Sequence, residues 1–254
     1  MTVTRWVPNQ HGAWVMIALP IVLGVEASRP SPWHVALVLA AYSGYLGSAA
    51  AQAWRRSRRR DLSRVPMLVY GAVFAASGLT LVLAYPALLA GLVVVVPAAV
   101  ISVGGARPGT RRDLANSLAQ VVQALVLVPA AGLMSGAFDP TRMALATAIA
   151  AGYLFGTVLL VRSVIRERGN AGAARLSLTW HLGLIALALV AIVAGRLSPA
   201  WLVLACLLAI RAALLPVLER RRAGTSHPLR PVQVGVVEIV ASVAVVTFAF
   251  VWPA

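Results

Sequence analysis

Glu238 is the residue of this sequence with the clearest reason to do chemistry. It is a carboxylate about seven residues inside the apolar stretch 231–252. A carboxylate that leaves water loses its hydration, so an unpaired charge at this place is costly. Glu238 should therefore pair with an arginine, stay protonated as a hydrogen-bond donor, or face water. It is a candidate acid–base group and a candidate ligand-binding residue.

A second group of polar residues lies in the run VRSVIRERGN at 161–170. Arg162 and Arg166 are four residues apart and would share one face of a helix. Two guanidinium groups on one face can clamp a phosphate, a diphosphate or a carboxylate. We include Asn170 in this candidate ligand-binding group. The alternative is that these arginines only mark membrane topology, with their long stems reaching the head groups.

The segment PNQHGAW at 8–14 holds a third group, Gln10 and His11. His11 could donate a hydrogen bond to an anion or act as an acid–base group, and Gln10 offers both donors and acceptors. Both residues stand at the start of an apolar stretch. A helix start exposed to water explains them equally well.

The fourth group is Arg112 with Asn116, Gln120 and Gln123. The three amides are four and then three residues apart, so they form one polar stripe along a helix. Such a stripe must face protein or water, either joining helices or lining a cavity. We include Arg112 and Asn116 among the candidate ligand-binding residues, and Asp113 is expected to cap this helix.

Metal and cofactor chemistry have no support in the sequence. The four histidines and the single cysteine, Cys206, show no spacing of metal ligands. Nucleotide-binding and hydrolase motifs are also missing. We therefore expect no metal site and no cofactor.

The composition indicates which kind of secondary structure positions these groups. Of 254 residues, 60% are apolar and 11% are charged, against about 25% charged in average soluble domains. The net charge of +15 comes from arginines in short bursts between long apolar stretches, a distribution that argues against a nucleic-acid-binding face. The sequence predicts an all-α, polytopic transmembrane bundle forming one domain over residues 1–254.

A membrane span needs about 20 apolar residues, and nine stretches are expected to form helices. They cover residues 11–28, 32–53, 65–84, 86–103, 115–136, 141–162, 174–195, 198–217 and 231–252. The third and fourth stretches meet at Tyr85-Pro86, where proline marks a break.

Arginine positions predict the orientation of these helices. One side of the nine-helix arrangement carries nineteen arginines and the other carries three, namely Arg29, Arg142 and Arg196. The nineteen are Arg5, Arg55, Arg56, Arg58, Arg59, Arg60, Arg64, Arg107, Arg111, Arg112, Arg162, Arg166, Arg168, Arg175, Arg211, Arg220, Arg221, Arg222 and Arg230. By the positive-inside rule the N-terminus is cytoplasmic and the C-terminus lies outside.

Several of these segments resemble the YwiC-like family of bacterial membrane proteins. The matching pieces are PNQHGAW at 8–14, VRSVIRERGN at 161–170, Gly235 through Ile239 before Ser242, and Asn116 in its LANSL context. The resemblance implies a multi-pass protein of the bacterial inner membrane and brings little mechanism with it.

A more distant resemblance is to the UbiA-like intramembrane prenyltransferases, which have nine helices and a cytoplasm-facing cavity. Their aspartate-rich motifs hold magnesium and an isoprenoid diphosphate. The corresponding stretches here, roughly 48–61 and 161–170, offer instead Gln52, Arg55, Arg56, Arg162 and Arg166. Magnesium needs hard oxygen ligands, which arginine lacks. The resemblance thus implies a shared fold with direct binding of an anion by arginine.

Three functions remain open from the sequence. The first is a UbiA-like membrane protein that binds an anionic amphipathic ligand (a lipid, an isoprenoid or a quinone-like molecule), with transferase-like catalysis as an open question. The second is a transporter or exporter in which Glu238 and an arginine form a switchable pair. The third is an assembly partner of a membrane complex, with its protein partners unknown. All three place the chain in the lipid bilayer and none involves nucleic acid.

Overall fold

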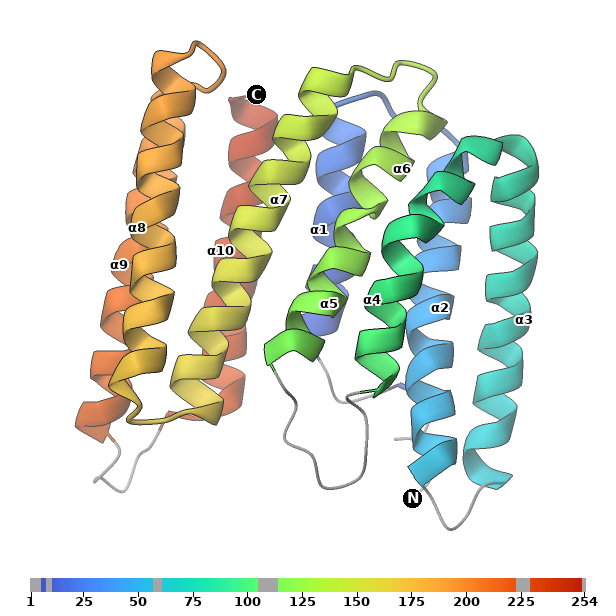
Figure 1. Cartoon of the computed structure of the whole chain (residues 1–254), viewed down its shortest axis with the longest axis horizontal. Helices are drawn as coiled ribbons and strands as arrows, with labels where there is room; N and C mark the ends of the chain where they lie inside the picture. Colours follow the sequence, from blue (N-terminus) through green and yellow to red (C-terminus); the bar gives the residue numbers. More distant parts are fainter. Residues whose placement is uncertain (1–5, 8–10, 57–60, 105–113, 223–228, 253–254) are drawn as a thin grey trace. The chain divides into compact units, whose positions relative to one another are not determined.

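The structure of the chain is a computed structural model (Figure 1). It describes residues 6–7, 11–56, 61–104, 114–222 and 229–252. Within these ranges every regular element is a helix, which confirms the expected all-α class. The helices form two compact units, Met1–Met143 and Ala144–Ala254. A single domain over residues 1–254 stays a prediction.

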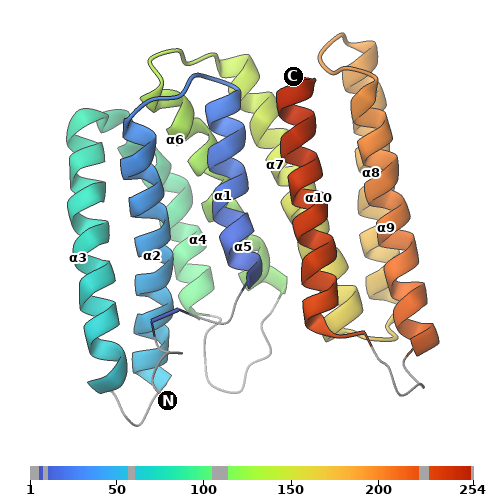
Figure 2. The same cartoon turned by 180° about the vertical axis from the view of Figure 1, so that it is seen from behind.

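The first unit contains six α-helices and the start of a seventh, all within the described residues (Figures 1 and 2). Their bounds are α1 (His11–Glu26), α2 (Trp33–Arg56), α3 (Asp61–Ala84), the 3₁₀ helix η2 (Pro86–Gly91), α4 (Leu92–Gly104), α5 (Leu114–Leu125), α6 (Leu127–Met134) and the first residues of α7 (Pro140–Val161). The second unit holds the rest of α7, the π-helical turn η3 (Arg162–Arg166), α8 (Ala171–Val193), α9 (Ala200–Arg222) and α10 (Pro231–Val251).

Each of the nine predicted apolar stretches is helical over most of its described residues. In the described part of the chain, seven helical segments are long and apolar enough to cross a membrane, so the chain is a polytopic helical membrane protein. The stretches predicted at 11–28 and 86–103 form shorter apolar helices, Trp14–Glu26 and Pro86–Ser102. The second of these begins as a 3₁₀ helix at Pro86, where the break was expected.

The predicted helix 115–136 is divided into α5 and α6 at Val126. Pro129 follows three residues later. Its ring displaces the carbonyl four residues earlier, and it has no N–H to donate to that carbonyl. The helix resumes with a bond from the Ala130 N–H to the Val126 carbonyl at 3.2 Å. The proline thus bends this segment without ending it.

The first unit is held by close approaches between helices. Helix α2 packs along α3, α4 along α5, and α1 along α6. A Cβ built on Gly24 of α1 would lie 2.5 Å from the Val128 carbonyl oxygen, so glycine is needed at this crossing. His34 accepts from the Ser31 N–H at Nδ1, and its Nε2 therefore carries a proton and donates to the Ala131 carbonyl at 2.9 Å. This bond ties the start of α2 to α6.

Apolar side chains cover much of the outer surface of both units. In α3 the exposed ones include Leu68, Phe74 and Leu83, and in α8 they include Leu187 and Val193. In water such helices would aggregate, whereas lipid tails solvate them. The exposed surface therefore agrees with a membrane protein.

Candidate functional site

An ion pair lies between the middle of α9 and α10 in the second unit. Arg211 Nη1 is 2.9 Å from Glu238 Oε1, and the two side chains are 9% and 12% exposed. Proline at the first position of α10 and a bond from the Arg230 N–H to Gln233 Oε1 at 2.9 Å mark where that helix begins, which places Glu238 two turns inside it. Glu238 therefore pairs with an arginine, one of the three alternatives expected for it.

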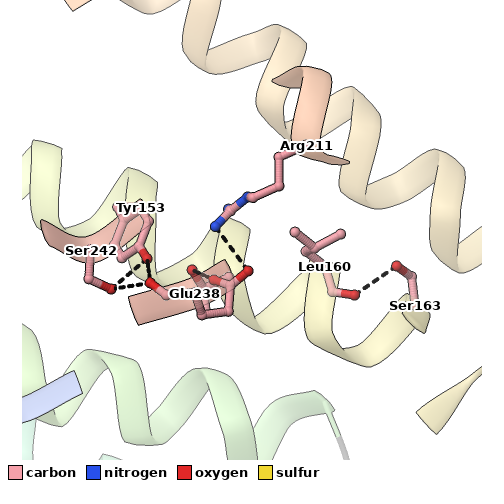
Figure 3. Close-up of polar contacts among 7 residues, drawn as sticks. Tyr153, Leu160, Ser163, Arg211, Glu238 and Ser242 are labelled. Carbon is pink, nitrogen blue, oxygen red and sulfur yellow. Dashed lines mark hydrogen bonds and ion pairs between the residues drawn. The ribbon is translucent and has the colours of Figure 1, made fainter. Parts of the chain in front are cut away.

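Helix α7 completes the surroundings of Glu238 (Figure 3). The Thr157 hydroxyl donates to Glu238 Oε2 at 2.8 Å, so each carboxylate oxygen has a partner. The Tyr153 hydroxyl lies 3.0 Å from the Glu238 backbone carbonyl and 2.7 Å from Ser242 Oγ. Ser242 in turn lies 2.7 Å from the same carbonyl. These bonds fix the position of Glu238 between α7, α9 and α10.

Arg211 keeps one edge of its guanidinium free. Its Nε and Nη2 atoms are buried and have no hydrogen-bond partner within the described part of the chain. Nε–H and Nη2–H are parallel donors, and this edge commonly binds both oxygens of a carboxylate or a phosphate. The Arg211 Cζ also lies 5.8 Å from the centre of the Tyr153 ring. Buried donors without partners cost free energy, so this edge is a candidate site for an acceptor.

Helix α8 contributes buried polar groups to the same unit. His181 Nδ1 lies 2.7 Å from the Ser177 carbonyl, so Nδ1 must carry the proton and Nε2 is left as an acceptor. The Ser177 hydroxyl is buried without a partner among the described residues. Trp180 attaches α8 to α7 through a 3.0 Å bond to the Gly152 carbonyl. All four helices of the unit thus carry polar groups in its interior.

The connection between α7 and α8 is a rigid turn. A bond from the Glu167 N–H to the Arg162 carbonyl closes the π-helical turn at 2.8 Å. Arg162 forms an ion pair with Glu167, whose other oxygen accepts from Asn170. Asn170 also caps α8 by accepting from the backbone of Gly172 and Ala173. Arg162 and Asn170 thus have protein partners, and their role as ligand-binding residues stays a prediction, as does that of Arg166.

Arg168 joins this turn to the segment between α9 and α10. Its Nη2 donates to the Leu229 carbonyl at 2.9 Å, its Nε donates to the Val164 carbonyl, and Nε lies 4.0 Å from Glu219. Glu219 is buried at the end of α9. Beneath these contacts the side chains of Leu160, Val164, Ala212, Leu229 and Val234 pack together. The end of the unit that carries these arginines is therefore fixed.

The other predicted site residues lie in the first unit. Gln10, Arg112 and Asp113 lie outside the described residues, and so does the helix cap expected from Asp113. His11 is the first residue of α1, and the structure does not describe its side chain. Asn116 is buried and accepts from Gln120 at 3.5 Å. Gln123 donates to Ser102 of α4 at 2.9 Å. Gln123 of the polar stripe thus joins α5 to α4, which is one of the two uses expected for the stripe. Because polar side chains in a bilayer need protein or water around them, the sequence also predicts that His11, Asn116, Arg162 and Glu238 converge on one site, and this stays a prediction.

Sequence reasoning missed Arg211, Tyr153, Thr157 and Ser242. Arg211 was assigned to the cytoplasmic arginines, and this was wrong because it lies midway along α9. Its distance from both ends of the stretch 198–217 was a signal, since topology arginines stand at span ends. The three hydroxyl residues carry no such signal, because a hydroxyl in a helix can bond to its own backbone.

The sequence of this chain is similar to one protein family and to one known protein. The family model described as YwiC-like protein matches residues 7–131. Uncharacterized protein YwiC from Bacillus subtilis (strain 168) is 28% identical over 185 residues, which cover 69% of this chain and 74% of that protein. The chain is similar to the YwiC-like family over these residues.

This similarity agrees with the resemblance to that family noted in the sequence. The matched residues 7–131 include the PNQHGAW segment and Asn116 of this chain, and they end before Arg211 and Glu238. No solved structure matches the chain.

Proposed function

We propose that this chain is a multi-pass protein of the bacterial inner membrane that binds an amphipathic ligand with an oxyanion head group. The head group binds to the free edge of Arg211 and the apolar tail lies along the helices. A lipid or an isoprenoid with a carboxylate or phosphate head has this chemistry. The observation that carries the proposal is the buried, unpartnered pair Nε and Nη2 of Arg211.

The charge and shape of this edge favour an oxyanion over other ligands. Its two parallel N–H groups match two oxygens on one atom, which gives a bidentate contact. Nη1 is already occupied by Glu238, so the ligand meets donors that no side chain uses. In an apolar interior, where water is scarce, such charge-assisted bonds are stronger than at a surface.

A UbiA-like arrangement without magnesium remains part of this proposal. Gln52, Arg162 and Arg166 stand where aspartate motifs would be needed. Their side chains offer an amide and guanidinium groups, a poor set for a hard cation. We therefore derive no step through a metal, and direct contact between arginine and an anion takes its place.

Thermal unfolding of the purified protein in dodecyl maltoside tests the proposal. Decanesulfonate supplies an oxyanion with an apolar tail, and decanol supplies the same tail without charge. At about 100-fold excess over its Kd, decanesulfonate should stabilise the protein by about 2.7 kcal/mol. Decanol should produce a far smaller shift.

Arg211→Lys is the decisive variant. Lysine keeps the positive charge for Glu238 but has no parallel pair of N–H groups. We expect the shift with decanesulfonate to be largely lost in Arg211→Lys and kept in Arg196→Lys, which alters an exposed arginine between α8 and α9. Equal shifts in the wild type and Arg211→Lys, or equal shifts with the sulfonate and the alcohol, would refute the site.

Transport across the membrane is a second candidate function. It is favoured by the position of the ion pair, which joins the middle of α9 to α10 and has the form of a pair that can open and close. In proteoliposomes, flux of a transported anion should fall in Glu238→Gln. Unchanged flux would remove the pair from transport. A stoichiometric protein copurifying in mild detergent would favour an assembly partner instead.

A further inference from the structure

The ionic groups around Glu238 balance to zero before any ligand binds. Arg211 of α9 contributes one positive charge, and Glu238 of α10 contributes one negative charge. From α7, Tyr153 and Thr157 contribute hydroxyl groups, and from α8 His181 contributes an imidazole whose Nδ1 is already protonated. No other ion pair with Glu238 exists among the described residues.

An oxyanion on the free edge of Arg211 upsets this balance. It would place a second negative charge on the same guanidinium that Glu238 already neutralises. The two anions repel, and a net charge of −1 would remain inside an apolar bundle. Two carboxyl groups that share one site keep a proton for this reason. One proton restores neutrality.

We propose that the anion binds together with one proton, and that Glu238 takes that proton. This inference rests on the proposed function of Arg211. The proton comes from water and adds to a carboxylate oxygen of Glu238, while Arg211 keeps its charge and pairs with the anion through Nε and Nη2. Thr157 keeps its bond, because the carbonyl oxygen of a carboxylic acid still accepts. Glu238 is then the residue that couples ligand binding to proton uptake.

Two other groups of the unit must be distinguished from Glu238 as the proton acceptor. His181 Nε2 is a second atom that can take up a proton, since Nδ1 donates to the Ser177 carbonyl. The ligand itself could also be protonated if it were a carboxylate or a phosphate. Decanesulfonate removes this ambiguity, because a sulfonate stays ionised throughout the range in which the protein is folded.

Isothermal titration calorimetry with decanesulfonate measures the protons taken up. The wild-type protein in dodecyl maltoside is titrated in buffers with different ionisation enthalpies, and the slope of the binding enthalpy gives the proton count. We expect about one proton to be taken up per anion bound. In the pH range of this uptake, the Kd should rise about tenfold for each unit by which the pH is raised. Glu238→Gln should bind with no uptake and little pH dependence. His181→Gln should behave like the wild type.

Each alternative result has a definite meaning. Binding by the wild type without proton uptake would overturn the inference and leave the proposed function standing. Uptake that persists in Glu238→Gln, or that disappears in His181→Gln, would show that Glu238 does not take the proton. An absence of saturable binding, or binding that is unaltered in Arg211→Lys, would refute the proposed function itself. If Glu238→Gln does not fold, the wild-type proton count and the His181→Gln titration still decide the inference.

Discussion

Replacement of Arg211 and Glu238 by leucine, one at a time and together, tests whether the ion pair acts as a unit. At 2.9 Å and an effective dielectric constant of about 20, the attraction is about 6 kcal/mol before desolvation is subtracted. Either single change leaves one charge buried without its partner, which costs about 3–5 kcal/mol. The double variant leaves no charge, so it should be more stable than either single variant.

The assay is reversible unfolding in mixed dodecyl maltoside and dodecyl sulfate, followed by tryptophan fluorescence. A matched cycle on Glu26 and Arg142 is the control, because their charged atoms are 3.6 Å apart and the Arg142 side chain is 41% exposed. That cycle should give a coupling energy of at most about 1 kcal/mol. If the losses at Arg211 and Glu238 simply add, the two residues do not form the buried pair described here.

Three further substitutions test the packing around the site and in the first unit. Gly24→Ala should cost about 1–3 kcal/mol of unfolding free energy, because its Cβ would meet α6, whereas Gly183→Ala, with open space beside it, should be tolerated. Gln123→Leu should cost about 0.6 kcal/mol through the lost bond to Ser102, and equal stability of the variant and the wild type would argue against that bond. Arg168→Ala should speed hydrogen exchange at the start of α10 by freeing the Leu229 carbonyl, and unchanged exchange would show that the segment is held by other contacts.

The helices of this protein were largely predictable from its sequence, because lipid requires long, continuous apolar segments. Pro86 marked a true boundary. The division at Val126 was missed, since Pro129 leaves the apolar pattern unbroken and acts only on the backbone. Hydropathy predicts the length of a span, but it does not predict where the backbone hydrogen bonds of the helix are interrupted.

The site was predictable only at residues whose burial in an apolar segment costs much free energy. Glu238 was found because a buried carboxylate needs a partner. Its partner Arg211 could not be chosen from twenty-two basic residues without the packing of α9 against α10. The ion pair of Arg162 with Glu167, five residues later in the chain, was not foreseen either, and the ligand-binding role of Arg162 stays a prediction. A count of arginines does not show which of them form an ion pair with a carboxylate in the same turn of the chain.

The place of Arg211 in α9 has a consequence for how the chain enters the bilayer during synthesis. An arginine at the centre of a nascent segment adds about 2.5–3.5 kcal/mol to its insertion free energy, which the apolar residues around it must offset. Its neutralising partner is on the next helix to emerge from the ribosome. A polypeptide truncated after Arg222 would leave that guanidinium without Glu238, so α9 and α10 should be integrated by the translocon as a hairpin.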